Sequence, residues 1–291
     1  MALKSLSPPP EPALQTRDAE NAPPATPPKG NRPPRTFRQD RWGLPGLLPP
    51  LLLGLVVLAA WQFAVQSGAV SSFLLPFPAD VVRAFWFSLT DGLLPSYALT
   101  TLIESLAGCV LGALIALPLG YLIVRSRMIA SAVQPYVAAS QALPAVAIAP
   151  LIALWLGYGL SPVIALCALI VFFPLVITTV LGLRMLDHDI LDAARVDGAG
   201  RWALLRHMEF PLALPSILAG LRASLTLSVT GAVVGEFVVG GNGLGQLLLI
   251  DRSAADSAGV FATLLMLALL AAALYGLVRL LERSFSFAEA V

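Results

Sequence analysis

Charged side chains, and lysine above all, are scarce in this chain. Only 12% of its 291 residues are Asp, Glu, Lys or Arg, about half of the roughly 25% that is usual in soluble domains. A phosphate-binding loop of the GxxxxGK[ST] type needs a lysine. Lys4 lies too close to the N-terminus, and Lys29 has no glycine five residues before it. If ATP is used, its binding site therefore belongs to a separate polypeptide.

Cysteine and histidine are equally rare. Cys109 and Cys167 both lie within apolar runs, where small buried residues are expected rather than a disulfide framework. His188 and His207 are nineteen residues apart and have no HExxH pattern or cysteine cluster beside them. No nucleophile and base stand together either. The sequence therefore predicts no catalytic residue, no cofactor site and no metal site, and the chain is not expected to be an enzyme.

Apolar residues are abundant: 57% of the chain is hydrophobic, and the mean hydropathy is +0.82. Each apolar segment is long enough for the ~20 helical residues that cross a bilayer. We therefore predict an all-α membrane protein with six transmembrane helices, at about residues 46–66, 97–124, 130–158, 162–184, 213–239 and 259–281. Between the first two, "FPADVVRAFWFSL" predicts an interfacial helix on the external side, with Asp80 as its N-cap.

The composition also divides the chain. Residues 1–42 hold ten of the 24 prolines and are predicted to be a disordered cytoplasmic tail rather than a signal peptide. Residues 43–96 hold the first span and the interfacial helix. Residues 97–285 form the core, with a cytoplasmic loop at 185–211, and residues 286–291 are a C-terminal tail. With both termini in the cytoplasm, Arg83 and Arg252 alone of the 18 basic residues fall outside, as the positive-inside rule requires.

The cytoplasmic loop has its own helical pattern, "DILDAARVDGAGRWALLRHMEFPLALP" from Asp189 to Pro215. We expect a helix of about nine residues capped by Asp189 and ended by Gly198 and Gly200, then a second short helix that Pro211 stops. Helices this short are marginal in water. The first must pack either on its own bundle or in a groove of another protein. A DNA-binding helix-turn-helix is disfavoured because the unit is tethered between spans, so no nucleic-acid partner is expected.

The residues of this loop resemble a known pattern. Asp192-Ala193-Ala194, then Gly198, then Met208-x-Phe210-Pro211 is similar in spacing to the EAA loop, Glu-Ala-Ala, Gly, Ile-x-Leu-Pro, of permease subunits in binding-protein-dependent ABC importers. "GNGLGQLL" at 241–248 resembles the segment that follows their fifth span. The likeness extends from about Thr100 to Leu281, whereas the tail and the first span match less distinctively.

The resemblance implies a type I permease fold and a set of partners. In that family the loop forms a coupling helix that sits in a cleft of the ATPase subunit. The resemblance assigns an ATPase-coupling role to six residues: Asp189, Asp192, Ala193, Ala194, Gly198 and Pro211. It also implies a homodimer of permeases, two ATPase subunits and an external solute-binding protein, in the inner membrane of a bacterial cell. ATP-driven coupling further requires that the ATPase contact two states with different free energies.

Prolines and buried acids mark candidate pathway residues. The third segment carries Pro135, Pro144 and Pro150; interior prolines break helices where protein or a wet cavity satisfies the freed carbonyls. We predict that it lines the conduit, with a plain kinked packing helix as the alternative.

Two acids, Glu104 and Glu236, fall in the external halves of their spans. They predict either a polar vestibule wall or a hydrogen bond between helices. The alternative function is an ion-coupled secondary carrier that uses these two acids.

Gly108 and Gly112 in the second segment predict close helix packing.

Two further segments bear on the cargo. "LLPFPADVVRAF" and "LPAVAIAPLIALWLGYG" resemble the importer branch for nitrate, taurine, aliphatic sulfonates, thiamine pyrimidines and riboflavin compounds. The "TLIESLAG" segment is slightly more similar to the pyrimidine and vitamin members. Two external acids and no lysine or arginine embedded in the membrane also favour a neutral or cationic solute. The prediction leans to a thiamine-pyrimidine precursor or a riboflavin-like compound, with sulfonate, taurine or nitrate close behind.

Overall fold

A computed structural model describes residues 44–140 and 144–288. Within these residues every regular element is a helix, which confirms the all-α prediction. The chain separates into two compact units, Met1–Gly54 and Leu55–Val291. Described residues 44–54 of the first unit form the opening turns of helix α1. The predicted tail 1–42 lies outside the described residues.

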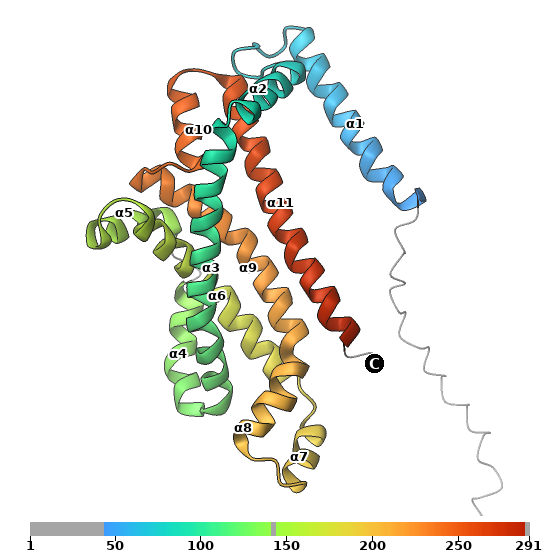
Figure 1. The fold of residues 1–291 in the computed structure, drawn as a ribbon, viewed down its shortest axis with the longest axis vertical. Helices are drawn as coiled ribbons and strands as arrows, with labels where there is room; N and C mark the ends of the chain where they lie inside the picture. The colour runs from blue at the N-terminus through green and yellow to red at the C-terminus, as the bar shows by residue number, and fades with distance from the viewer. Residues whose placement is uncertain (1–43, 141–143, 289–291) are drawn as a thin grey trace, which may run out of the picture. The chain divides into compact units, whose positions relative to one another are not determined.

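Twelve helical elements follow one another along the described part of the chain (Figure 1). They are α1 Leu44–Gln66, α2 Pro78–Thr90, α3 Leu93–Arg125, α4 Arg127–Ser140, α5 Ala145–Leu156, α6 Leu160–Arg184, α7 His188–Val196, α8 Arg201–Leu204, the π-helical turn η1 Leu205–Glu209, α9 Phe210–Val239, α10 Leu244–Ser253 and α11 Ser257–Ala288. The last helix continues past residue 286, where the sequence predicted a tail.

Five of these stretches are long and apolar enough to cross a membrane in the part of the chain that the structure describes. They are Leu48–Gln66, Leu93–Arg125, Leu160–Arg184, Arg201–Val239 and Ser257–Leu280. They coincide with the first, second, fourth, fifth and sixth predicted spans. The six-span topology and the cytoplasmic placement of both termini remain predictions.

The third predicted span, 130–158, is not one helix. It is divided into α4, with 14 residues, and α5, with 12, and neither reaches the ~20 residues of a full span. Pro144 has an extended conformation (φ −70°, ψ 126°) and is the N-cap of α5. Proline lacks the amide that would continue a helical ladder, so it begins a new helix here. Pro135 and Pro150 lie inside α4 and α5.

Helices α3, α6 and α9 form the central packing of the second unit. Gly112 and Gly120 on α3 allow a close approach to α6: a Cβ at Gly112 would lie 2.8 Å from the carbonyl oxygen of Ala168, and one at Gly120 2.8 Å from Cγ2 of Thr179. Ala116 between them is completely buried. The small residues of the second span therefore serve helix packing, as predicted.

The second unit has two distinct ends (Figure 1). Helices α7 and α8 lie at one end, beside the last turn of α3, whereas α2 and α10 lie at the opposite end. We call these the α7 end and the α10 end. The interfacial helix predicted after the first span is α2, but Phe77 is its N-cap residue, Pro78 lies in its first turn, and Asp80 is in that turn rather than at the cap. Proline suits the first turn because no partner is needed for an amide there.

Candidate functional site

The short helix predicted in the loop 185–211 is α7, and its cap differs from the predicted one. The helix begins at His188, and the carboxylate of Asp187 accepts a hydrogen bond from the amide of Asp189 at 2.9 Å. Asp187 is therefore the N-cap, and Asp189 lies in the first turn. The prediction was wrong by two residues because both positions carry an aspartate. Asp189 still favours the helix through its charge near the positive end of the dipole.

The other end of α7 is fixed by Gly198. This residue has φ +88°, and its amide donates to the carbonyl of Arg195 at 3.1 Å, while the amide of Ala199 donates to Ala194 at 3.0 Å. These two bonds form a Schellman motif, which needs a left-handed residue at this point. Gly200 plays a different part from the predicted one: with φ −66° it is the N-cap residue of α8.

Most of the large apolar side chains around α7 are left exposed by the residues that the structure describes. Leu191 is buried, and it anchors the helix. Val196 is 87% exposed, Met185 82%, and Trp202 72%. Asp192, Ala193 and Gly198 are also exposed. Since a nine-residue helix has little stability of its own, this surface has the composition of a docking site rather than that of a solvated loop.

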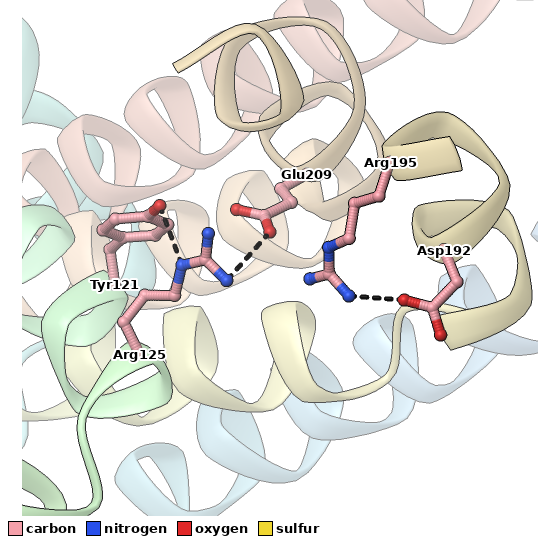
Figure 2. Close-up of polar contacts among 5 residues, drawn as sticks. All are labelled: Tyr121, Arg125, Asp192, Arg195 and Glu209. Atoms are coloured by element: carbon pink, nitrogen blue, oxygen red, sulfur yellow. Dashed lines mark hydrogen bonds and ion pairs between the residues drawn. The ribbon is translucent and has the colours of Figure 1, made fainter. Parts of the chain in front are cut away.

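Asp192 forms an ion pair with Arg195, one turn further on (Figure 2). Both side chains are largely exposed, and exposed pairs at this spacing contribute only about 0.3–0.5 kcal/mol to a helix. The pair is therefore weak enough to be given up for a stronger partner.

The second short helix does not end at Pro211, as the sequence predicted. Helix α8 continues through the π-helical turn η1 directly into α9, and Pro211 lies in the first turn of α9. The wider π turn changes the hydrogen-bond pattern just before the proline, so the missing amide does not break the helix. The loop is consequently joined to the long stretch Arg201–Val239 as one continuous helical rod.

Glu209, the last residue of η1, is 6% exposed and was not singled out from the sequence. Its Oε1 lies 3.9 Å from Nη1 of Arg125, the last residue of α3. Nε of Arg125 donates to the hydroxyl of Tyr121 at 3.2 Å. Figure 2 shows these three side chains in a row between α3 and the root of the loop. A regular α-helical wheel gives the wrong face for Glu209 because the π turn shifts the register.

The two acids of the predicted pathway meet at the α10 end. Glu104 is 1% exposed and Glu236 0%, and their carboxyl groups are neighbours in the packing of α3 against α9. Glu104 Oε2 has no hydrogen-bond partner among the described residues. Both side chains are enclosed by the helices, so neither faces an open vestibule in this structure. The predicted alternative, a hydrogen bond between helices, is made by Glu236, which accepts from Thr101 of α3.

Glu236 also anchors the glycine-rich loop before α10. Its carboxylate accepts the Thr101 hydroxyl at 2.7 Å and the amides of Gly245 and Gln246. Thr101 in turn accepts the amide of Leu244 at 2.8 Å. A carboxylate aimed at the free amides of a helix start is a strong cap. The "GNGLGQLL" segment is therefore tied both to α9 and to α3.

A largely apolar cavity of about 640 Å³ opens between α5, α6 and α9. Its polar groups are three hydroxyls, from Ser140, Thr178 and Thr230, and Phe173 supplies an aromatic ring. The pathway candidates Pro144 and Pro150 are not among its lining residues, although Pro174 is. The conduit role of the two prolines thus stays a prediction.

This arrangement of long apolar helices, with a partly uncovered helical loop at one end, is that of an integral membrane protein. Residues 108–287 match the family described as "Binding-protein-dependent transport system inner membrane component". The chain belongs to this family. It is therefore a permease of a binding-protein-dependent ABC importer, which favours this class over the ion-coupled carrier.

Relatives and solved structures agree with this assignment. The chain is 44% identical to the riboflavin transport system permease protein RibX of Chloroflexus aurantiacus, over 86% of this chain and 93% of that protein. It is 32% identical to a putative aliphatic sulfonates permease, SsuC, of Bacillus subtilis (82% and 86% covered). It is 30% identical to the formylaminopyrimidine permease ThiX of Halalkalibacterium halodurans (81% and 93% covered). The fold matches the MetNI methionine ABC transporter in inward-facing crystals, with a TM-score of 0.61 and 22% identity over 67% of this chain and 97% of that one.

Proposed function

We propose that this chain passes a riboflavin-like solute from an external binding protein to the cytoplasm of a bacterial cell. The observation that carries the proposal is the 44% identity to a riboflavin permease along 93% of that protein. Identity to the sulfonate and formylaminopyrimidine permeases is 32% and 30%. The sequence favoured a thiamine-pyrimidine precursor and a riboflavin-like compound equally, and the difference in identity supports the riboflavin-like compound.

The chemistry of the cavity between α5, α6 and α9 supports a neutral aromatic cargo. Its volume of about 640 Å³ falls within the 300–1,000 Å³ that is usual for small-molecule sites. Among the described residues, its walls carry hydroxyls and an aromatic ring but no arginine or lysine. A sulfonate or nitrate would have to enter this site without a charged partner, which is costly. A flavin offers flat rings to the apolar wall and polar groups to the hydroxyls.

We also propose that α7 is the handle by which an ATPase subunit moves this chain. Asp189 and Asp192 present charge at its first turns, Ala193 and Ala194 allow close approach, and Gly198 sets its exit. Pro211 lies where the loop becomes α9. Fully burying a side chain such as Val196 contributes about 1.5–3 kcal/mol. Docking of a few of these exposed apolar residues would therefore stabilise a complex substantially.

The assembly that follows from this role has two copies of this chain, two ATPase subunits and an external solute-binding protein, in the inner membrane. Because each of the two permease copies has one α7, closure of the two ATPase subunits on nucleotide acts on both copies together. The energy for transport then comes from the ATPase, because the contacts with α7 differ between the two states of the transporter.

The test is uptake by the reconstituted complex. Copies of this chain are purified with the cognate ATPase subunit and solute-binding protein, placed in liposomes, and supplied with ATP and labelled riboflavin. We expect ATP-dependent riboflavin uptake that exceeds uptake of taurine and formylaminopyrimidine. Selective taurine uptake would refute the flavin assignment. Uptake driven by an ion gradient without ATP would refute the ATP-driven mechanism.

A further inference from the structure

The carboxylate of Glu209 is buried without being satisfied. Its Oε2 is enclosed and accepts no hydrogen bond from the described residues, and its Oε1 stands 3.9 Å from Nη1 of Arg125. Closed pairs between a guanidinium and a carboxylate have N–O distances of about 2.7–2.9 Å. The ion pair is thus about 1 Å short of closure in this state.

An open pair of this kind has a free-energy cost. A buried charged group without hydrogen bonds destabilises a protein by several kcal/mol. The cost is removed if Arg125 moves inward and engages both oxygens, because the guanidinium fork matches a carboxylate. The geometry of Figure 2 allows this, since the Arg125 guanidinium already faces Glu209 and is steered by Tyr121. The same site therefore has an open and a closed arrangement.

The position of the pair gives the closure a mechanical meaning. The loop 185–211 is joined through the chain to α6 at one end and to α9 at the other. Helix α3 has no such connection to the loop. The Arg125–Glu209 pair joins the last residue of α3 to the last residue of the π turn η1. It therefore links α3, the one helix of the central packing that the chain does not connect to the loop, to the end of the loop.

We infer that Arg125 and Glu209 form a coupling joint, which closes when α7 is held by the ATPase and which makes α3 follow the loop. The two are positioning residues: they touch neither the solute nor the nucleotide. This inference rests on the proposed role of α7 as the ATPase handle. Without the Arg125–Glu209 pair, the ATPase should stay bound and hydrolyse ATP, but α3 should no longer move with the loop.

The first experiment measures uptake per ATP hydrolysed in the reconstituted complex. Glu209→Gln keeps the size and removes the charge, Arg125→Gln removes the charge and shortens the side chain, and the exchange Arg125→Glu with Glu209→Arg restores a pair. Arg127→Gln is the matched control: this arginine is two residues away, exposed, and has no ion pair in the described part of the chain. We expect both single variants to retain the ATPase and to lose at least about fivefold in uptake per ATP, the lower bound of typical coupling between sites. The exchange should recover most of the loss, and the control should resemble the unchanged protein.

The second experiment follows the movement itself. Spin labels are placed at Arg127, just past α3, and at His207 in the π turn; both positions are exposed. With Glu209 intact, the distance between them should stay constant when ATP is trapped, because α3 and the loop move together. In Glu209→Gln the distance should change on trapping. A melting curve of each variant shows whether it is folded.

The outcomes separate the two proposals. If the unchanged chain does not retain the ATPase through α7, the handle is refuted. If the handle holds but folded Glu209→Gln complexes keep full uptake per ATP and an unchanged distance, the joint is overturned. A loss in Arg195→Gln as large as that in Arg125→Gln would also overturn it, since the cation would then be the neighbouring arginine of α7.

Discussion

Replacing Gly198 by alanine tests how much one backbone conformation contributes to the proposed binding of the ATPase at α7. Gly198 ends α7 with φ +88°, and a Cβ built there meets no atom within 4 Å. The substitution therefore introduces no clash, and its cost is the strain of a left-handed alanine, about 1–2 kcal/mol. The two Schellman hydrogen bonds depend on that conformation, so the strain destabilises the C-terminal end of α7 and the turn that follows it.

That strain should appear in the affinity for the ATPase. If the partner binds the helix with its native exit, a cost of 1–2 kcal/mol corresponds to an affinity about 5- to 30-fold weaker. The assay is a titration of the ATPase subunit onto the permease in nanodiscs, with a melting curve to show that the membrane bundle is intact. Gly198→Asn should bind better than Gly198→Ala, because asparagine tolerates the left-handed region.

Gly200→Ala is the matched control, two residues further on. Gly200 has φ −66° and ψ 162°, which any residue adopts, and a Cβ there also meets nothing within 4 Å. We expect a change of less than about 0.5 kcal/mol, because the poorer helix cap is offset by a less flexible unfolded chain. Equal ATPase affinity for Gly198→Ala and Gly200→Ala would refute the view that the ATPase requires the left-handed backbone conformation at the C-terminal end of α7.

Three further substitutions test the packing and the α10 end. Thr101→Val should lower the free energy of unfolding by about 2–6 kcal/mol, because the Glu236 carboxylate and the Leu244 amide each lose a buried hydrogen bond. Thr101→Ser should retain most of the stability, and equal melting temperatures for Thr101→Val and the unchanged protein would contradict the role of Thr101 in holding the loop before α10. Gly112→Ala should cost about 1–3 kcal/mol by overpacking, whereas Gly276→Ala, with open space around it, should be neutral or stabilising in the same melting assay. Burial raises the pKa of the Asp251 carboxyl above its ordinary value of 3.8, although the Thr263 hydroxyl opposes this. The folded form therefore binds the proton more tightly, so stability falls as pH rises from about 3.8 through the raised pKa; Asp251→Asn should flatten this dependence, and an unchanged pH profile would contradict it.

The sequence was most informative where one physical signal dominates. Long apolar runs predicted the membrane helices, because little else places twenty such residues together. Gly198 was recognised as a helix end because few residues adopt its backbone conformation. The small residues of α3 were likewise recognised as a packing face.

The sequence failed where several residues compete for one task. Asp187 and Asp189 are both able to cap α7, and only the backbone path shows which does. The register of the π turn cannot be read from a regular helical period, so Glu209 and its partner Arg125 were missed, and Pro211 was taken for a stop. Glu104 and Glu236 were noticed as costly acids, but the hydrogen bond from Thr101 of α3 to Glu236 depends on how α3 and α9 are packed.

The π turn has a consequence for insertions and deletions in this family. It holds an additional residue compared with an α-helical turn, so the removal of one residue from Leu205–Glu209 would convert it to regular α-helix without breaking the rod. The deletion would rotate α8 by about 100° around the axis of α9 and draw it toward α9 by about 1.5 Å. The removal of a single residue at this turn would thus change the direction in which α7 and α8 project from the bundle, while the packing of α3, α6 and α9 is kept.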